Sequence, residues 1–248
     1  MLRQWERQWK PSHWAVVFDG GTPQERLDLL ATYKGNRPDM PEALRQQFPL
    51  VEEYLEGARI ARLRVEGCEA DDVIASVAAR TLDAFEEILI VTSDKDFCQL
   101  VSEKIQMISP AKSEARVGIE DVVKRTGVRP ERVVELLALT GDAADNVPGV
   151  PGMGPKTAAR LLSQCDSLAD LLSRPETVAS EKTRESLAQH RDRILRNLAI
   201  IRLRCDLQVP LSVADMEARM PDPAVLLPFF EKMEFHGMAD DLRTPSLL

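Results

Sequence analysis

Short apolar runs without alternation mark the first part of the chain. Ala15–Phe18 and Ile88–Val91 are wholly apolar and stop abruptly at polar residues. This pattern is typical of strands that are buried on both faces of a parallel sheet. Further strands are expected near residues 61–65 and 105–108, and a helix is expected over residues 44–55. Strands that alternate with helical segments in this way predict an α/β fold.

After the last of these strands the apolar positions follow a helical period. Apolar pairs such as Leu136 and Leu137 recur at the spacing of a helix face turned toward a core. The second half is therefore predicted to be all-helical. We expect an α/β domain over residues 1–116, a helical domain over 117–215, and a proline-rich tail over 216–248 that packs back onto the body.

The composition is that of an ordinary soluble protein. Its 248 residues include 40 Asp and Glu against 32 Lys and Arg, and the net charge of −8, taken alone, argues against a nucleic-acid partner. No apolar run approaches the ~18 residues that span a bilayer, and the first residues lack a signal-peptide core, so we expect a cytoplasmic protein with no membrane partner. Four cysteines without a C-x-x-C pair and three histidines argue against zinc and disulfides. A monomer is the default expectation.

Carboxylates follow two of the predicted strands at the point where each strand ends. Asp19 comes directly after the first apolar run, and Asp94 and Asp96 follow the run at 88–91. Because the carboxyl ends of parallel strands form the ligand edge of a sheet, we expect these three side chains to point into one crevice. A solvated turn or a helix cap explains any one of them equally well.

Two further acidic clusters lie at helix positions. Glu69, Asp71 and Asp72 stand at the start of an amphipathic helix, where the helix dipole favours one or two acids but does not readily explain three. Asp142 and Asp145 are spaced i, i+3 and are able to share a helical face. Like charges on one face repel unless a cation lies between them.

Together these clusters predict a metal centre made of carboxylates. The eight candidate ligands are Asp19, Glu69, Asp71, Asp72, Asp94, Asp96, Asp142 and Asp145. Without them the chain has 32 acidic against 32 basic residues, so the net charge no longer argues against nucleic acid. Oxygen ligands select hard cations such as Mg²⁺, and eight carboxylates suffice for about two ions. Two such ions are a recurring device for phosphodiester hydrolysis, which then needs no nucleophilic side chain.

A glycine-rich segment beside the last acidic pair predicts a phosphate-binding hairpin. Gly152 and Gly154 allow close approach of the backbone, and the following helix begins with Lys156, Thr157 and Arg160 near its free N–H groups. A bland connection between helices is the alternative, but G-x-G-P-K-T-A before an apolar helical run is the helix-hairpin-helix pattern. We expect it to bind the DNA backbone in a salt-sensitive way with little sequence specificity.

Residues 22–47 hold a second basic group. Arg26, Tyr33, Lys34 and Arg37 combine cations with an aromatic ring, which suits a single nucleic-acid strand. From the residues alone, a solvated surface helix is an equally good interpretation.

These motifs, in this order, resemble the 5′-nuclease family, which comprises the 5′→3′ exonuclease domain of bacterial DNA polymerase I, its stand-alone homologues and the flap endonucleases. The matching segments are VVFDGGTPQER, TYKGNRP, GCEADDVIAS, VTSDKDFCQL, LTGDAADNVPGVPGMGPKTAARLL, IRLRCDLQVPL and FFEKMEF. The resemblance implies a Rossmann-like (PIN-like) parallel-sheet domain followed by a helix-three-turn-helix DNA-binding domain. It also implies an enzyme that cuts DNA at 5′ ends, 5′ flaps and duplex junctions during primer removal and repair.

The resemblance further assigns roles to individual residues. Asp19, Glu69, Asp71 and Asp72 would hold the catalytic Mg²⁺, for which Mn²⁺ is the alternative, and Asp94, Asp96, Asp142 and Asp145 would hold a second ion. Backbone carbonyls around Val150 and Met153 would hold K⁺. Residues 22–47 would form the family's helical arch, with Arg26, Tyr33, Lys34 and Arg37 on the scissile strand. A DNA polymerase partner and association with the bacterial nucleoid are implied as well.

One part of the family pattern has no counterpart in this sequence. Family members begin with a further strand that ends in Asp-Gly and supplies another metal ligand, whereas this sequence begins at what resembles the helix before the family's second strand. The alternatives are a truncated or misassigned start, an inactive paralogue, or a gap covered by residues 1–14. The other eight acids and the hairpin are present, so we favour the first.

Two rival functions follow from the same residues. A DNA-junction binder without catalysis would keep the hairpin and lose turnover through the lacking strand. A related metal-dependent ribonuclease would share the α/β core, but the hairpin at 152–156 favours duplex DNA.

Overall fold

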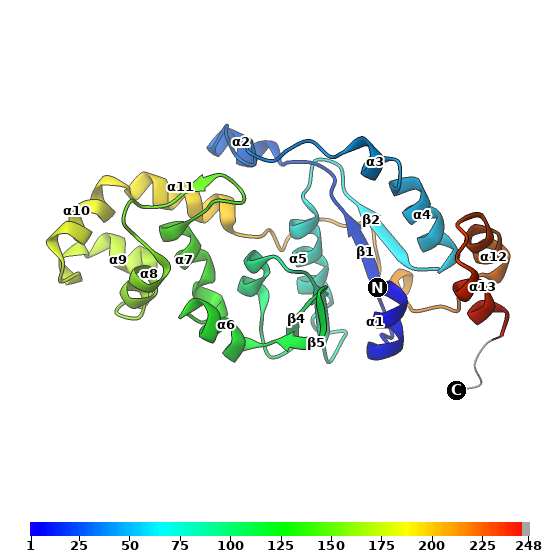
Figure 1. Ribbon diagram of the computed structural model, residues 1–248. Helices are drawn as coiled ribbons and strands as arrows, with labels where there is room; N and C mark the ends of the chain where they lie inside the picture. The colour runs from blue at the N-terminus through cyan, green and yellow to red at the C-terminus, as the bar shows by residue number, and fades with distance from the viewer. Residues whose placement is uncertain (245–248) are drawn as a thin grey trace. The chain divides into compact units, whose positions relative to one another are not determined.

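The structure, a computed structural model, describes residues 1–244, with the backbone alone for residues 112–114, and its contacts divide the chain into two compact units (Figure 1). Unit 1 combines Met1–Asp19, Pro38–Val65 and the residues from Val209 onward. Unit 2 combines Gly20–Arg37 with Glu66–Gln208. The expected tail over 216–248, whose last residues 245–248 lie outside the described part, belongs to unit 1.

Unit 1 is built on one pair of parallel strands. Its elements are α1 (Leu2–Trp9), β1 (Ala15–Phe18), α3 (Glu42–Arg45), α4 (Phe48–Gly57), β2 (Ala61–Arg64), α12 (Pro223–Lys232) and α13 (His236–Arg243). β1 runs parallel to β2, with Ala15 opposite Ala61. Helix α12 packs on α4, and Leu55, Phe229 and Phe230 form the centre of a small apolar core. Segments from both ends of the sequence therefore share this core.

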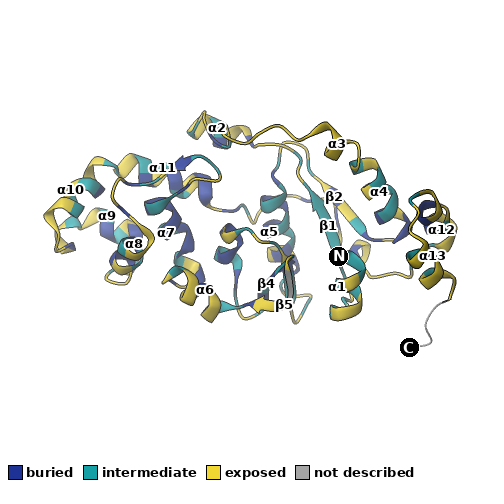
Figure 2. Ribbon diagram, viewed as in Figure 1, coloured by how far each residue is buried: buried dark blue, intermediate teal, exposed yellow. Residues whose placement is uncertain are grey.

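Unit 2 contains the remaining elements. They are α2 (Gln24–Leu29), α5 (Ala70–Thr81), β3 (Ile88–Val91), the 3₁₀ helix η1 (Lys95–Leu100), β4 (Ile105–Ser109), β5 (Lys112–Val117), α6 (Ile119–Thr126), η2 (Pro130–Arg132), α7 (Val133–Thr140), β6 (Gly141–Asp142), β7 (Val147–Pro148), α8 (Pro155–Leu162), α9 (Leu168–Ser173), η3 (Pro175–Thr177), α10 (Glu181–Gln189) and α11 (Arg191–Ile201). A further 3₁₀ turn, η4 (Ala214–Met216), lies in unit 1. Helix α7 is the most buried of the helices that carry the core of unit 2 (Figure 2).

The four strands expected from the apolar runs are confirmed, but they pair in two sheets instead of one. β3 pairs in parallel with β4, which pairs antiparallel with β5, while β1 pairs with β2. The argument that placed Asp19 and Asp94 at one shared sheet edge therefore does not apply. Strand β5 was not expected, because its charged sequence Lys-Ser-Glu-Ala-Arg-Val lacks an apolar run.

The second half is helical apart from the two-residue ladder of β6 and β7. Helix α7 stops at Gly141, whose φ of 80° lies in the left-handed region that favours glycine. Asp142 and Asp145 consequently lie in a β6–β7 turn and do not share a helical face, which corrects the i, i+3 interpretation. Among the described residues no helix is long and apolar enough to cross a membrane.

Candidate metal centre

The start of α5 carries the first group of acids. Glu69 stands at the N-cap position, and Asp71 and Asp72 lie in the first helical turn, where their charge complements the helix dipole. Val73, one residue later, is fully buried and anchors this turn in the unit. Glu69 and Asp72 are 3% and 0% exposed, so their charges need partners inside the protein.

The second group follows β3. The Asp94 side chain caps η1 by accepting a hydrogen bond from the backbone N–H of Asp96 at 2.9 Å. This cap turns the Asp96 side chain inward, where it is 9% exposed. The buried Phe97, which comes next, fixes the register of the turn.

The β6–β7 turn supplies the third group. Asp142, which is 3% exposed, accepts from the backbone N–H of Ala144 at 3.0 Å and so stabilises its own turn. Asn146 closes the turn with a φ of 57°. Its side-chain amide donates to the carbonyl of Thr32 at 2.7 Å, which ties the turn to the segment before Lys34.

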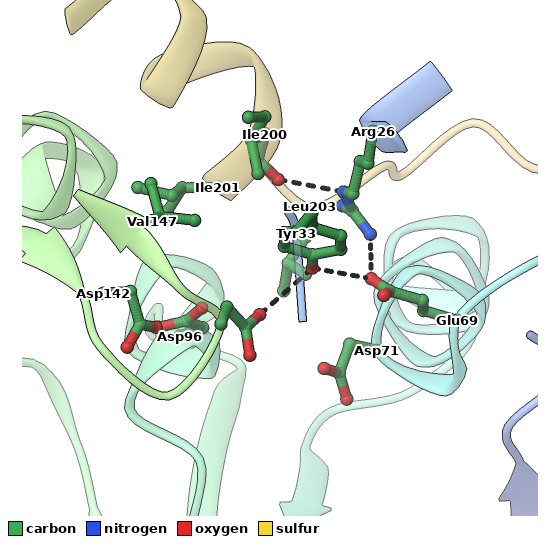
Figure 3. Close-up of a pocket in the computed structure, with 11 residues that line it drawn as sticks. Arg26, Tyr33, Glu69, Asp71, Asp96, Asp142, Val147, Ile200, Ile201 and Leu203 are labelled. Carbon is green, nitrogen blue, oxygen red and sulfur yellow. Dashed lines mark hydrogen bonds and ion pairs between the residues drawn. The ribbon is translucent and has the colours of Figure 1, made fainter. Parts of the chain in front are cut away.

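These groups meet in one pocket of unit 2. Ligand oxygens of Asp96, Asp142 and Asp145 lie within 4.8 Å of one another. Figure 3 shows Glu69 and Asp71 on one side of the pocket and Asp96 and Asp142 on the other. Apolar side chains close the remaining wall, namely Val147, Ile200, Ile201 and Leu203.

Arg26 neutralises the innermost acids. Its guanidinium donates to both carboxylate oxygens of Asp72 at 2.8 Å and also to Glu69. Its Nε donates to the carbonyl of Ile200 at 2.9 Å (Figure 3). The Arg26 side chain is only 7% exposed. Burial lowers the pKa of Arg26, but the hydrogen bond and charge of Asp72 outweigh it, so the guanidinium stays charged. Asp72 also accepts from the backbone N–H of Arg204 at 2.9 Å, so both of its oxygens have protein partners.

The rest of the predicted strand-binding group also contacts acids. The single hydroxyl proton of Tyr33 is shared between Asp145 at 3.0 Å and Glu69 at 3.2 Å. Burial, followed by these charges, raises the pKa of Tyr33, which keeps the phenol protonated. Lys34 donates to Glu69 at 2.6 Å and lies 3.7 Å from Asp145. Arg37 pairs with Asp145 as well. Like charges in this pocket are thus held together by cations that belong to the protein.

The backbone reinforces this contact. Lys34 has a φ of 54°, a conformation that side chains rarely adopt, and its N–H donates to the carbonyl of Asp145 at 3.0 Å. Asn36 donates to the carbonyl of Ala143 at 3.0 Å. The segment 32–37 and the turn 143–146 are therefore joined along their whole length.

Two carboxyl groups of the pocket lack enough positive charge. Burial, followed by the charge of Asp94, raises the pKa of Asp71 to about 6. Burial and then the charges of Asp94 and Asp142 raise the pKa of Asp96 to about 7. The buried Oδ1 of Asp96 has no hydrogen-bond partner among the described residues. An orphaned carboxylate oxygen beside two further carboxylates is what a hard divalent cation requires, so the residues present fit such an ion.

The seven acids of unit 2 come together, whereas Asp19 is an exposed residue at the end of β1 in unit 1. Asp71, Asp96, Asp142, Asp145 and Glu69 line the pocket itself. Asp72 and Asp94 lie behind it and act on its residues through Arg26, through the η1 cap and through charge.

The glycine hairpin leads into α8 at the predicted helix start. Gly154 is the N-cap of α8 and Pro155 occupies its first turn, so the first N–H groups of the helix have no partner within it. Lys156 and Arg160 are exposed, and no described residue pairs with either; Thr157 is half-buried beside them. Val150 and Met153 are buried, and the Met153 N–H donates to the Val150 carbonyl at 3.0 Å.

Three residues of the site were missed from the sequence. Lys95 donates to Asp142 at 2.8 Å, and its position between two aspartates was the only signal. Gln99 donates to the carbonyls of Asp96 and Ile201, which steadies η1 against the segment after α11. Asn197 is fully buried without any sequence pattern that marks it.

This fold and pocket define a nuclease-like class, and comparison with known proteins gives the family. Residues 1–127 match the 5′-3′ exonuclease N-terminal resolvase-like domain, and residues 128–224 match the 5′-3′ exonuclease C-terminal SAM fold. The chain therefore belongs to the 5′-3′ exonuclease family. The predicted combination of an α/β domain with a helical domain is confirmed by these matches.

Individual relatives agree. DNA polymerase I of Rhizobium leguminosarum is 40% identical over 228 residues, which cover 91% of this chain and 22% of that protein. A 5′-3′ exonuclease of Aquifex aeolicus is 35% identical over 94% of this chain and 79% of its own length. This chain spans 22% and 28% of the length of two of the polymerase relatives. Among solved structures, the flap endonuclease of bacteriophage T5 has the same fold, with a TM-score of 0.70 and 22% identity over 81% of this chain and 78% of that one.

Proposed function

We propose that the chain is a divalent-metal-dependent 5′ nuclease that hydrolyses DNA phosphodiester bonds, exonucleolytically from 5′ ends and endonucleolytically at 5′ flaps. The observation that carries this proposal is the cluster of Asp96, Asp142 and Asp145, whose ligand oxygens lie within 4.8 Å of one another in a chain of the 5′-3′ exonuclease family. The bacteriophage T5 relative in fold was solved in complex with DNA and metal ions, which supports both ligands.

The ligand assignment follows the two sides of the pocket. Glu69 and Asp71 would hold one Mg²⁺ ion, and Asp96, Asp142 and Asp145 would hold the other, with Mn²⁺ as the alternative metal. Asp72 and Asp94 would orient the groups around them. The bound ions would supply the Lewis acid for the two-metal hydrolysis of a phosphodiester.

The side chains around the acids have a distinct task. Lys34, which is 12% exposed, and Arg37, which is 48% exposed, would contact a phosphate of the DNA once the acids no longer need their charge. Arg26 is held by Asp72 and by the Ile200 carbonyl, so we assign it to positioning the acids rather than to a mobile DNA contact. The predicted stacking of Tyr33 on a base would require its release from Glu69 and Asp145.

The hairpin would hold the duplex. Gly152 and Gly154 bring the backbone to a phosphate, and Lys156, Thr157 and Arg160 would bind neighbouring phosphates without reading sequence. The carbonyls near Val150 and Met153 would hold K⁺. The chain would act in primer removal and repair with a DNA polymerase as partner. It would do so at the nucleoid in the cytoplasm.

The decisive experiment is cleavage of a 5′-labelled flap duplex by the purified 248-residue chain with Mg²⁺ or Mn²⁺, with EDTA as control. Binding of the same flap in Ca²⁺ is measured alongside. We expect metal-dependent release of the flap. Binding without cleavage would contradict the nuclease and leave a junction binder, and an RNA flap cut in preference to DNA would favour a ribonuclease.

A further inference from the structure

Helix α11 carries a buried polar residue that the proposed chemistry does not use. Asn197 is 0% exposed and lies among the apolar residues Ile194, Ile200 and Ile201 of the same helix. Burial of an amide in such surroundings is costly unless every polar atom finds a partner. The partners that Asn197 finds show what it holds.

All the partners of the Asn197 amide nitrogen are backbone carbonyls. Its Nδ2 donates to Ala138 at 3.1 Å and to Pro148 at 2.9 Å. Ala138 lies in the last turn of α7, whose carbonyls need partners from outside the helix, and Pro148 lies in β7. The Oδ1 accepts from Arg196 at 3.2 Å. The amide thus joins the two ends of the segment that contains Asp142 and Asp145.

Arg193 extends this contact by one residue. It precedes Asn197 by one helical turn and donates from Nη1 to the carbonyl of Gly149 at 3.0 Å. Consecutive carbonyls of the chain, those of Pro148 and Gly149, are therefore held by neighbouring side chains of one rigid helix. The next residue, Val150, donates its N–H to the Leu139 carbonyl at 2.8 Å.

The held segment leaves no space for adjustment. A Cβ added at Gly149 would lie 2.2 Å from the Thr140 carbonyl oxygen, and one added at Gly141 would lie 2.3 Å from the Gly149 nitrogen. The backbone strands before and after the acidic turn are thus in direct contact. The acidic turn lies between the two backbone strands of this crossing, and a few residues after it lies the hairpin that ends in Lys156.

We propose that Asn197 and Arg193 are positioning residues that fix the distance between the acidic turn at 142–145 and the phosphate hairpin at 150–156. This inference rests on the proposed nuclease function, in which the acids mark the bond to be cut and the hairpin holds the duplex. The pair would then determine where along the DNA the cut falls, without touching substrate.

The test compares two arginines of α11. Arg193→Met removes the donor to Gly149 and keeps most of the side-chain volume, whereas Arg191→Met removes the same charge from an exposed position on the same helix. The products of flap cleavage are resolved to single nucleotides. We expect Arg193→Met to spread the cut over neighbouring phosphodiesters and Arg191→Met to keep the wild-type position. Arg193→Lys, which retains a cationic donor, should restore a single main product.

A second readout does not depend on cleavage. Mn²⁺ binding to the free protein is measured by calorimetry, and we expect Arg193→Met to weaken it about three- to tenfold, the range of one lost hydrogen bond. Asn197→Leu should have the larger effect in both assays if it folds. Identical product positions and identical Mn²⁺ affinity in the Arg193 and Arg191 variants would overturn the inference. A wild-type chain that binds Mn²⁺ but cuts nothing would overturn the proposed function. The Mn²⁺ affinities of the variants alone would then test whether Arg193 positions the acidic turn.

Discussion

Two basic regions of unit 2 have opposite surroundings. The segment 20–37 buries Arg26 and holds Lys34 against acids, whereas Lys156 and Arg160 of the hairpin are exposed with no partner in the described part of the chain. DNA binding was predicted for the hairpin from its glycines, its helix start and its charge, and for the first region from the resemblance to the family. In the first region Arg26 is fixed by carboxylates and a backbone carbonyl, and Lys34 and Arg37 would have to leave their acids to reach a phosphate. The second region is available to an external phosphate without losing a protein partner among the described residues.

Cations of the protein itself neutralise part of the negative charge of the pocket. Four cations of the protein, Arg26, Lys34, Arg37 and Lys95, contact its acids. The acids around the pocket are therefore partly neutralised within the protein, and the net charge of −8 is not that of one uncompensated crevice. Metal ions would have to compete with protein cations for oxygens, and above all with the ammonium groups of Lys34 and Lys95.

The largest expected effect is loss of DNA cleavage without loss of DNA binding. Asp142→Asn keeps the shape of the turn and removes a charge from the cluster, so we expect cleavage to fall by about three orders of magnitude. Binding of the flap in Ca²⁺, measured by fluorescence anisotropy, should change little. Asp192→Asn, an exposed acid of α11, is the control and should cut normally. An equal loss of binding and cleavage in Asp142→Asn would show that the turn is structural.

The next effect is on stability and compares a buried with a half-exposed arginine of the segment 20–37. Arg26→Met leaves Glu69 and Asp72 buried without their counter-ion, so we expect the free energy of unfolding to fall by about 3–5 kcal/mol. Arg37→Met removes a half-exposed partner of Asp145 and should cost less than about 1 kcal/mol. Urea unfolding followed by circular dichroism measures both. Similar losses in the two variants would contradict the division between a structural and a mobile cation.

A smaller effect should appear in metal affinity. Lys34→Met removes an ammonium that competes for Glu69, so Mn²⁺ should bind about tenfold more tightly, the equivalent of one charge-assisted hydrogen bond. Calorimetry on the DNA-free protein measures this. Lys182→Met on α10 makes the same charge change at an exposed position and should leave the affinity as it is. Weaker Mn²⁺ binding in Lys34→Met would mean that the lysine orders the site instead of competing for it.

The smallest effect concerns the free cations of the hairpin. Lys156→Ala should weaken binding to every duplex sequence alike and reduce the slope of log affinity against log salt by about one. Titrations at several salt concentrations with two unrelated duplexes measure it, with Lys124→Ala on α6 as the control. A loss confined to one of the duplexes would contradict a contact to the backbone.

The fold was predictable where residue type alone decides. The short apolar runs of β1 and β3 favour buried strands of a sheet, and Gly154-Pro155 favours the start of a helix, here α8. The pairing of β1 and β3 in separate sheets depends on tertiary contacts that no local pattern encodes. Strand β5 is charged and was missed for that reason.

The site divides in the same way. Seven of the acids that were found by type and position meet around one pocket of unit 2. The cations that accompany them were assigned to DNA, because a sequence shows the charge of Arg26 but not the Ile200 carbonyl that turns it inward. The role of Asn197 could not be predicted, because it depends on the carbonyls of Ala138 and Pro148, which are distant in the sequence.

The discontinuous make-up of unit 1 also has a consequence during synthesis on the ribosome. Its core needs Leu55 from the first quarter of the chain and Phe229 and Phe230 from the last stretch of it. Residues 1–19 and 38–65 therefore emerge long before their partners exist, while all of unit 2 is already complete when residue 208 has left the tunnel. The nascent chain would carry a finished unit 2 and an apolar fragment of unit 1 whose core is incomplete until α12 has been made, so chaperone contacts and premature cleavage by proteases should concentrate on residues 38–65.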